Sequence, residues 1–333
     1  MRRSIKKVAA GLLATMMIGT MLTGCGGGNK KDSGSSKKET SEINIGFSQV
    51  GAESDWRVAN TKSMKSELTA KNGFKLSFAD AQQKQENQLT AIRNFIQQEV
   101  DYIVLAPVTE TGWDTVLQEA KDAGIPVIIV DRMVDVSDDS LYTAWVGSNF
   151  KLEGQKAMAW LDAYLEAKGR GDEEINLVDI QGTIGASAQI GRTQGFDDAV
   201  EAHDNWTTLA QQSGEFTQAK GQEVMESILK QSGDDIDVVY CENDNEAFGA
   251  IDAIEAAGYE VGGEEGQILV MSFDTTNAGL TDTLSGKITL DTECNPLHGP
   301  RVQEIIEKLE AGEEVDNCLL YTSPSPRDRQ KSR

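Results

Sequence analysis

The chain has 333 residues, enough for about two domains of ~150 residues each. It is 39% hydrophobic and 26% charged, a composition that supports globular cores and excludes a fully disordered polymer. Its 54 acidic residues outnumber 31 Lys and Arg, which argues against nucleic acid as the main partner. With only two His and four Cys, we expect no metal centre, no cofactor and no disulfide-stapled scaffold.

The N-terminus has the pattern of an export signal. Four basic residues among the first seven precede an apolar run over 8–22, which is too short and wrongly flanked for a membrane span. The run ends in Leu22–Cys25, which resembles a bacterial lipobox, whose Cys thiol takes diacylglycerol before cleavage. We therefore expect 1–24 to be a lipoprotein signal peptide, Cys25 to carry the lipid anchor, and 25–41 to be a flexible linker. Cleavage removes four basic and no acidic residues, so the net charge of −23 becomes −27.

Downstream of the linker, short apolar runs alternate with helical periodicity. The predicted strands are Ile43–Phe47, Leu76–Asp80, Tyr102–Ala106, Val127–Val130, Ile175–Ile180, Leu209–Gln212, Asp237–Tyr240 and Ile268–Phe273. The helices between them are predicted at Trp56–Leu68, Gln85–Gln98, Trp113–Ala123, Leu152–Leu165, Ile190–Ala202, Gln218–Leu229 and Ala247–Ala257. This alternation is typical of doubly wound parallel sheets, and its restart after Gly147 predicts two α/β lobes.

Polar side chains follow most of the predicted strands. In open α/β sheets, ligands bind beyond the carboxyl ends of the strands. These ends carry Ser48-Gln49, Glu53–Arg57, Asp80, Asp131-Arg132, Gln181, Cys241–Asp244 and Ser272–Asp274. Each segment alone also fits an ordinary solvent-facing loop. Together, Arg forks, carboxylates and an indole suit a neutral polyol, because forks and carboxylates reach adjacent hydroxyls while an aromatic face packs on sugar C–H groups.

Several motifs resemble one known family. They are Gly46–Gly51, Glu53–Arg57, Ala79–Gln88, Ala106–Val108, Thr111–Trp113, Val130–Arg132, Leu152–Gly154, Gln181–Ser187 and Gln212–Thr217. The set is similar to type I periplasmic binding proteins of ABC sugar importers, of the ribose/galactose type, and within these to the galactofuranose-binding subgroup. The resemblance covers roughly Ile43 to Ala311.

The resemblance implies two lobes joined by a hinge that the chain crosses three times, near Gly147, near Glu293 and after Asn317. The N-terminal lobe would be 42–147 with 294–317, and the C-terminal lobe would be 148–293. It further implies a monomeric, non-enzymatic receptor that closes on one monosaccharide, galactofuranose-like or galactose, ribose or arabinose, and presents it to ABC permease subunits. With Cys25 lipidated, the protein would be anchored to the outer face of the cytoplasmic membrane.

Carried over by motif, the ligand contacts would be Glu53, Ser54, Trp56, Arg57, Asp131, Arg132, Arg192, Asn243, Asp274 and Glu293. The sequence departs from the subgroup beside these positions. Asp55 stands where Gly is usual, Gly191 stands where an acid is usual, and Glu242 stands where His is usual.

Other interpretations use some of the same residues. Asp131, Asp274 and Glu293 would serve as a glycosidase carboxylate pair, but their spacing fixes no separation and no nucleophile accompanies them. A sugar-responsive repressor would need a helix-turn-helix, which the N-terminus lacks. A sugar-sensing co-receptor for a membrane kinase or chemoreceptor remains an alternative, and a Cys241–Cys294 disulfide remains open.

The C-terminal stretch has a different composition. Two of the six prolines fall within 323–327, and Cys318–Asp328 can be back-translated as a transposase-type sequencing adapter. We therefore expect 318–333 to be a non-native tail, the alternative being a disordered basic tail.

Overall fold

The computed structural model describes residues 42–316 and 318–320. The predicted signal peptide 1–24, the lipidation site Cys25 and the linker to residue 41 lie outside the described residues, as does the predicted tail from 321 onward. Within the described part of the chain, no helix combines the length and apolar character needed to cross a membrane.

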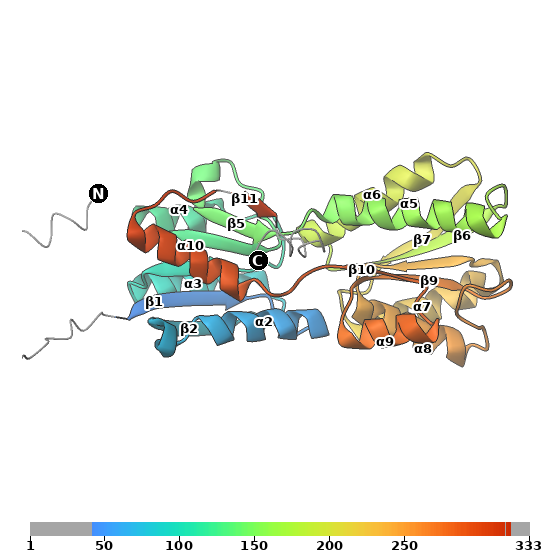
Figure 1. Ribbon diagram of the computed structural model, residues 1–333, viewed down its shortest axis with the longest axis horizontal. Coiled ribbons are helices and arrows are strands. Elements are labelled where there is room, and N and C mark those ends of the chain that lie inside the picture. Colours follow the sequence, from blue (N-terminus) through green and yellow to red (C-terminus); the bar gives the residue numbers. More distant parts are fainter. Residues whose placement is uncertain (1–41, 317, 321–333) are drawn as a thin grey trace, which may run out of the picture. The chain divides into compact units, whose positions relative to one another are not determined.

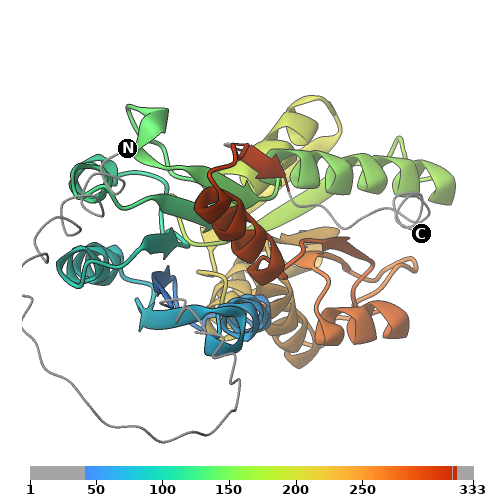
Figure 2. The ribbon, with the colours of Figure 1, turned by 60° about the vertical axis from the view of Figure 1, so that its left-hand side comes forward.

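The first sheet is parallel and six-stranded, in the order β11-β5-β4-β3-β1-β2. Its strands are β1 (Ile43–Gln49), β2 (Phe74–Asp80), β3 (Tyr102–Leu105), β4 (Val127–Asp131), β5 (Ala144–Gly147) and β11 (Cys318–Leu320). Its helices are α2 (Asp55–Glu67), α3 (Gln85–Gln97), α4 (Asp114–Asp122) and α10 (Gly299–Ala311), with short 3₁₀ turns at Ala70–Asn72 and Asp139–Leu141. Figure 2 shows β11 beside β5.

The second sheet is parallel and five-stranded, in the order β10-β9-β8-β6-β7. Its strands are β6 (Ile175–Gln181), β7 (Trp206–Ser213), β8 (Val238–Cys241), β9 (Leu269–Asp274) and β10 (Leu290–Glu293). Its helices are α5 (Phe150–Lys168), α6 (Ser187–Glu201), α7 (Gln218–Ser232), α8 (Asp244–Ala256) and α9 (Asn277–Ser285), with a 3₁₀ turn at Gly233–Asp235.

Both sheets repeat one winding. In each, the first strand of the lobe lies between the second and third, so the strand order reverses beside β1 and beside β6. This confirms the prediction of two doubly wound parallel sheets. Ligands of such sheets bind beyond the carboxyl strand ends at the reversal, which is where the polar segments of the sequence lie.

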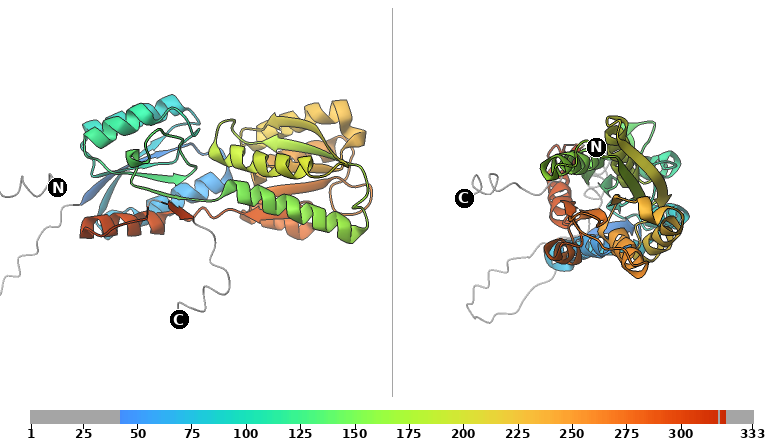
Figure 3. Two further views of the ribbon diagram at one scale, coloured as in Figure 1. Left: turned by 90° about the horizontal axis from the view of Figure 1, so that it is seen from above. Right: turned by 90° about the vertical axis from the view of Figure 1, so that its right-hand side faces the viewer.

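Helices cover both faces of each sheet. In the first lobe, α2 and α10 lie side by side and bury Met64 and Ile305 on one face, while α3 and α4 cover the other (Figure 3). In the second lobe, α5 and α6 cover one face and α7 and α8 the other (Figure 1). Strands buried on both faces are continuously apolar, as in β3, whose four residues are all buried.

Helices α5 and α6 pack unusually close because glycines face the contact. A Cβ at Gly191 would lie 2.7 Å from the backbone nitrogen of Lys151 and 2.7 Å from Phe150 Cβ. Any larger residue at this position would therefore push the two helices apart. Gly191 thus fixes the position of its neighbour Arg192 on α6.

Within the described residues, two segments join the lobes. The chain leaves β5 at Gly147 and enters α5 at Phe150, and it returns between Glu293 and Gly299. The segments meet where Ser148 Oγ lies 3.6 Å from Cys294 Sγ.

One face of α2 holds the returning segment. Trp56 Nε1 donates to the Cys294 carbonyl at 2.7 Å, Asn60 Nδ2 donates to the Pro296 carbonyl at 3.0 Å, and Ser63 Oγ accepts from the Gly299 amide at 3.0 Å. These three α2 residues recur at helical spacing, so they share one face.

Candidate functional site

The site begins at the N-terminus of α2. Ser54 has extended backbone angles, and its Oγ accepts a hydrogen bond from the Arg57 amide at 3.1 Å, which caps the helix. The cap places Glu53 and Arg57 on the same side, and Arg57 Nε donates to Glu53 Oε1 at 2.8 Å.

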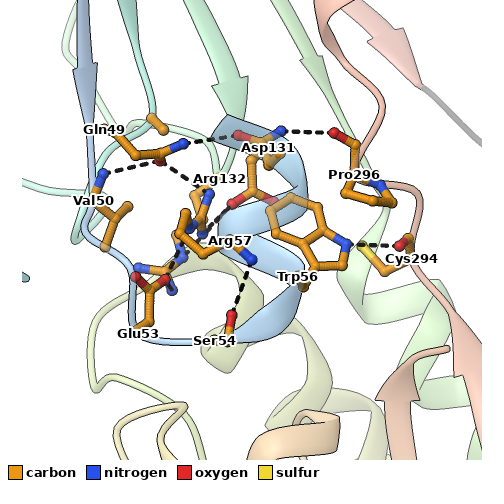
Figure 4. Close-up of polar contacts among 12 residues, drawn as sticks. Gln49, Val50, Glu53, Ser54, Trp56, Arg57, Asp131, Arg132, Cys294 and Pro296 are labelled. Carbon is orange, nitrogen blue, oxygen red and sulfur yellow. Dashed lines mark hydrogen bonds and ion pairs between the residues drawn. The ribbon is translucent and has the colours of Figure 1, made fainter. Parts of the chain in front are cut away.

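Arg57 is the centre of a buried network in the first lobe (Figure 4). Its Nη2 donates to Asp131 Oδ2 at 2.6 Å and its Nη1 donates to Gln49 Oε1 at 3.3 Å. Burial alone would lower the pKa of Arg57, but Asp131 and Glu53 outweigh burial and raise it. Burial would likewise raise the pKa of Asp131, but Arg57 and Arg132 lower it. Both groups are therefore charged at neutral pH.

Arg132 is held less completely by the protein. Its Nη1 donates to the Val108 carbonyl at 3.0 Å, and its nearest carboxylate oxygens are Glu53 Oε1 at 3.8 Å and Asp131 Oδ2 at 4.0 Å. Burial and the neighbouring Arg57 lower the pKa of Arg132 to about 10. Among the described residues, neither Arg132 Nε nor Glu53 Oε2 has a hydrogen-bond partner, although both atoms are buried. Such an unmatched donor and acceptor indicate a polar ligand.

The second lobe contributes Arg192. Its Nη2 lies 3.0 Å from Glu153 Oε2 and 3.5 Å from Asp274 Oδ1, and its Nη1 donates to the Glu242 carbonyl. The guanidinium carbon lies 5.3 Å from the Phe150 ring centre and 4.6 Å from that of Phe273. Two rings and two carboxyl groups thus fix the plane of the fork.

The two acids beside Arg192 respond to burial. Burial raises the pKa of Glu153 and, more strongly, that of Asp274, and Arg192 opposes both shifts. Burial therefore favours the neutral form of both acids, while Arg192 favours their charged form. Arginines and acids lie side by side in the site, an arrangement that suits a neutral ligand.

Strained backbone presents an acid from each lobe. Asp131 ends β4 with φ 64° and Asp274 ends β9 with φ 104°, both in the region that favours glycine. Trp145 Nε1 donates to the Asp131 carbonyl at 3.0 Å. This carbonyl also packs against Gly147, where a Cβ would overlap its oxygen. Strain of this kind is kept where it serves a site.

Thirteen residues from the two lobes and the returning segment line one cavity. Nine are among the ten residues predicted as ligand contacts: Glu53, Ser54, Trp56, Arg57, Asp131, Arg132, Arg192, Asn243 and Asp274. The structure does not bring Glu293 into this cavity. Its exposed side chain lines a neighbouring groove with Asp55 and Leu297.

Sequence reasoning missed four lining residues: Phe150, Ala188, Phe216 and Cys294. Phe216 has φ 60°, and its ring lies against Gly182, where any Cβ would overlap it. Asn243 Nδ2 donates to the Phe216 carbonyl at 3.2 Å, while Asn243 Oδ1 caps α8 by accepting from the Glu246 amide. Phe216 lies within a family-like motif, but only the fold shows that its ring lies against the Arg132 guanidinium, 4.9 Å away.

Metal and disulfide chemistry find no support in the part of the chain that the structure describes. No group of three His, Cys, Asp or Glu residues there is placed to hold a metal ion. Cys241 and Cys294 are both buried and unbridged, which answers the open question of their pairing.

Comparison with known proteins identifies the family. A family model described as a periplasmic binding protein domain matches residues 45–292. The chain belongs to the periplasmic binding protein family. This is a family of binding proteins, so the prediction that the chain is not an enzyme is confirmed.

Periplasmic binding proteins of known ligand are among its relatives. The galactofuranose-binding protein YtfQ of Escherichia coli (strain K12) is 44% identical over 282 residues, which cover 84% of this chain and 86% of that protein. A Mycobacterium smegmatis structure in complex with β-D-fucofuranose has a TM-score of 0.79 at 40% identity, covering 87% of this chain and 96% of that one. The arabinose-transporter binding protein from Shewanella sp. ANA-3, bound to α- and β-L-arabinofuranose, has a TM-score of 0.76 at 39% identity, covering 87% and 96%.

Proposed function

We propose that this periplasmic binding protein is the solute receptor of an ABC importer for furanose sugars of the galactofuranose and arabinofuranose kind. Relatives about 40% identical that bind such sugars support the choice of ligand. The observation that carries the proposal is that Arg132 Nε and Glu53 Oε2, two buried atoms of cavity-lining residues, have no hydrogen-bond partner among the described residues.

Sugar hydroxyls satisfy both atoms in a way that an ion does not. A hydroxyl donates through its proton and accepts through its oxygen. Ligand hydroxyls would therefore donate to Glu53 Oε2 and accept from Arg132 Nε. An anionic ligand would be repelled by the Glu53 carboxylate, and a cationic ligand would be repelled by the Arg132 guanidinium.

The cavity lies between the two lobes. Because first-lobe and second-lobe groups both line the cavity, a bound sugar would bridge the lobes and favour the closed state that a permease recognises.

Selectivity would follow from desolvated hydrogen bonds. A sugar that lacks one hydroxyl leaves a buried donor or acceptor unmatched, which costs about 1–3 kcal/mol. Epimers that misplace one hydroxyl should therefore bind about 10- to 100-fold more weakly.

Calorimetric titration of residues 25–316 tests the proposal. The ligands would be L-arabinose, D-galactose and D-fucose, which contain furanose forms at equilibrium, with D-glucose as the control. We expect saturable heat with at least one of the first three and no conversion of the sugar. Absence of binding to all three would overturn the furanose assignment.

We also propose that the mature protein is a membrane-anchored lipoprotein with diacylglycerol on Cys25. Support comes from the lipobox-like Leu22–Cys25 and the polar stretch that follows it. Expression of the full chain with labelled palmitate should label the wild type and not Cys25→Ser. Equal labelling of the two proteins would refute the anchor.

A further inference from the structure

The loop that presents Asp274 to the cavity adopts a strained conformation. Asp274 and the next residue, Thr275, have φ values of 104° and 54°, two consecutive non-glycine residues in the left-handed region. Such a conformation persists only where its surroundings hold it. The groups that hold it lie behind the loop, outside the cavity.

Two carboxyl groups hold this loop, one for each residue after Asp274. Asp291 Oδ1 on β10 accepts from the Thr275 amide at 3.0 Å and from its hydroxyl at 3.3 Å. Asp244 Oδ2 on α8 accepts from the Thr276 amide at 2.8 Å and from its hydroxyl at 2.7 Å. Two successive amides and two successive hydroxyls are thus fixed by two acids from different elements.

The two carboxyl groups also face each other. Both Oδ2 atoms occupy the space beside Gly279 on α9, where a Cβ would overlap each of them. Within the described chain, Asp291 Oδ2 has no hydrogen-bond partner apart from Asp244. Two carboxylate oxygens in contact repel each other when both are ionised, and a proton between them makes a hydrogen bond.

We propose that Asp291 keeps a proton, donates it in a hydrogen bond to Asp244, and that this pair is a positioning device that holds Asp274 in its ligand-binding geometry. Asp244 is the acceptor, since its Oδ1 already accepts from Ser272 Oγ at 2.6 Å and its Oδ2 from Thr276. When Asp291 is protonated, its Oδ2 can donate a hydrogen bond to Asp244, the one partner that the described residues offer this oxygen. The pair thereby links β9, β10 and α8 behind the ligand.

The surrounding charges favour retention of this proton. The one titratable side chain of α9 is Asp282, so α9 offers no cation. The charged groups on the other elements around the pair and the loop include Asp274 on β9, Arg192 on α6, Glu153 on α5 and Glu246 on α8, and Asp55 and Glu293 line the groove on the other side of the loop. Only Arg192 is cationic, and it is engaged with Asp274 and Glu153.

The pair should make ligand binding depend on pH. Burial and the neighbouring Asp244 raise the pKa of Asp291 to about 8. Below this pH the proton is present and the loop is held. Above it, two adjacent carboxylates repel, the loop loses its support and Asp274 moves away from its position beside Arg192.

Substitution of Asp291 by Asn or Ala tests the pair. An Asn amide donates to Asp244 and its oxygen accepts from Thr275, so Asp291→Asn copies the protonated state at every pH. We expect the affinity of this variant for sugar to equal that of the wild type at pH 6.5. Between pH 7 and 9 the affinity of the wild type should fall, while that of Asp291→Asn should stay constant. Asp291→Ala should bind ~10-fold or more weakly at every pH, and Asp282→Asn is the matched control, with the wild-type profile.

A second readout needs no ligand. Amide hydrogen exchange of Thr275 and Thr276 in the sugar-free protein should be slow in wild type and Asp291→Asn, and at least 10-fold faster in Asp291→Ala. The inference rests on the proposed function only for the titrations with L-arabinose and D-galactose. If the wild type binds neither sugar, the proposed function fails while the exchange measurement still tests the pair.

Two results would overturn the proposal that a proton shared by Asp291 and Asp244 holds the loop. One is an identical pH profile of exchange in wild type and Asp291→Asn. The other is full protection of both amides in Asp291→Ala. If Asp291→Ala does not fold, the comparison of wild type with Asp291→Asn decides alone.

Discussion

Replacing Arg132 by Met should weaken ligand binding strongly while leaving the fold nearly unchanged. Within the described chain the protein gives the Arg132 guanidinium one hydrogen bond, to Val108, and its carboxylate contacts are 3.8 and 4.0 Å long. The substitution also removes the repulsion that Arg57 exerts on Arg132, which helps lower the pKa of Arg132. These effects offset each other, so we expect the free energy of unfolding to change by no more than about 1 kcal/mol.

The effect on binding should be much larger. A hydrogen bond to a charged group contributes about 1.5–3 kcal/mol. Its loss corresponds to a dissociation constant about 10- to 150-fold higher. Met keeps the length and apolar stem of Arg, so lost packing contributes little.

Calorimetric titration with L-arabinose or D-galactose, whichever binds the wild type, measures the change, and urea unfolding measures stability. Arg93→Met is the matched control, because Arg93 is an exposed Arg of the same lobe that pairs with Glu119 at 2.9 Å. It should bind sugar as the wild type does. A wild-type dissociation constant in Arg132→Met would refute the role given to the unmatched Nε.

Three further predictions concern other parts of the site. Arg57→Met leaves two buried carboxylates without their cation and should lower the free energy of unfolding by about 3–5 kcal/mol; urea unfolding with no loss would contradict this. Gly182→Ala drives a methyl group into the Phe216 ring, so we expect weaker sugar binding and a loss of about 1–3 kcal/mol of stability, and unchanged affinity and melting temperature would count against the packing described. Burial raises the pKa of Glu242 to about 8, so its contribution to stability is full below the unfolded pKa of 4.5 and is lost as pH rises to 8. Glu242→Gln should therefore flatten the fall in stability between pH 5 and 8, and an unchanged slope in urea unfolding would exclude this carboxyl as a cause.

The sequence predicted the sheets because parallel strands buried on both faces are continuous apolar runs. Segments such as Tyr102–Leu105 and Val127–Asp131 show this pattern, and Gly and Pro separate them from the helices. The strand-end rule then gathers Arg57 and Asp131 at one edge before any coordinates are known. The nine predicted contacts that line the cavity come from the family resemblance; the strand-end rule accounts for those that end a strand, such as Asp131 and Asp274.

The remaining differences depend on geometry that a sequence does not express. Successive side chains along an extended segment point in opposite directions. Cys294 faces the cavity, so the preceding Glu293 points away from it. Phe216 reaches the cavity through a positive φ that its residue type does not favour, and Glu153 joins Arg192 because glycines bring α5 and α6 together.

The most direct test of the account is a crystal structure of the protein with its bound sugar. The account predicts a furanose ring in the cavity, with hydroxyl oxygens within ~2.7–3.2 Å of Arg132 Nε and of Glu53 Oε2. A pyranose ring, a charged ligand, or a sugar that leaves these two atoms unmatched would contradict it.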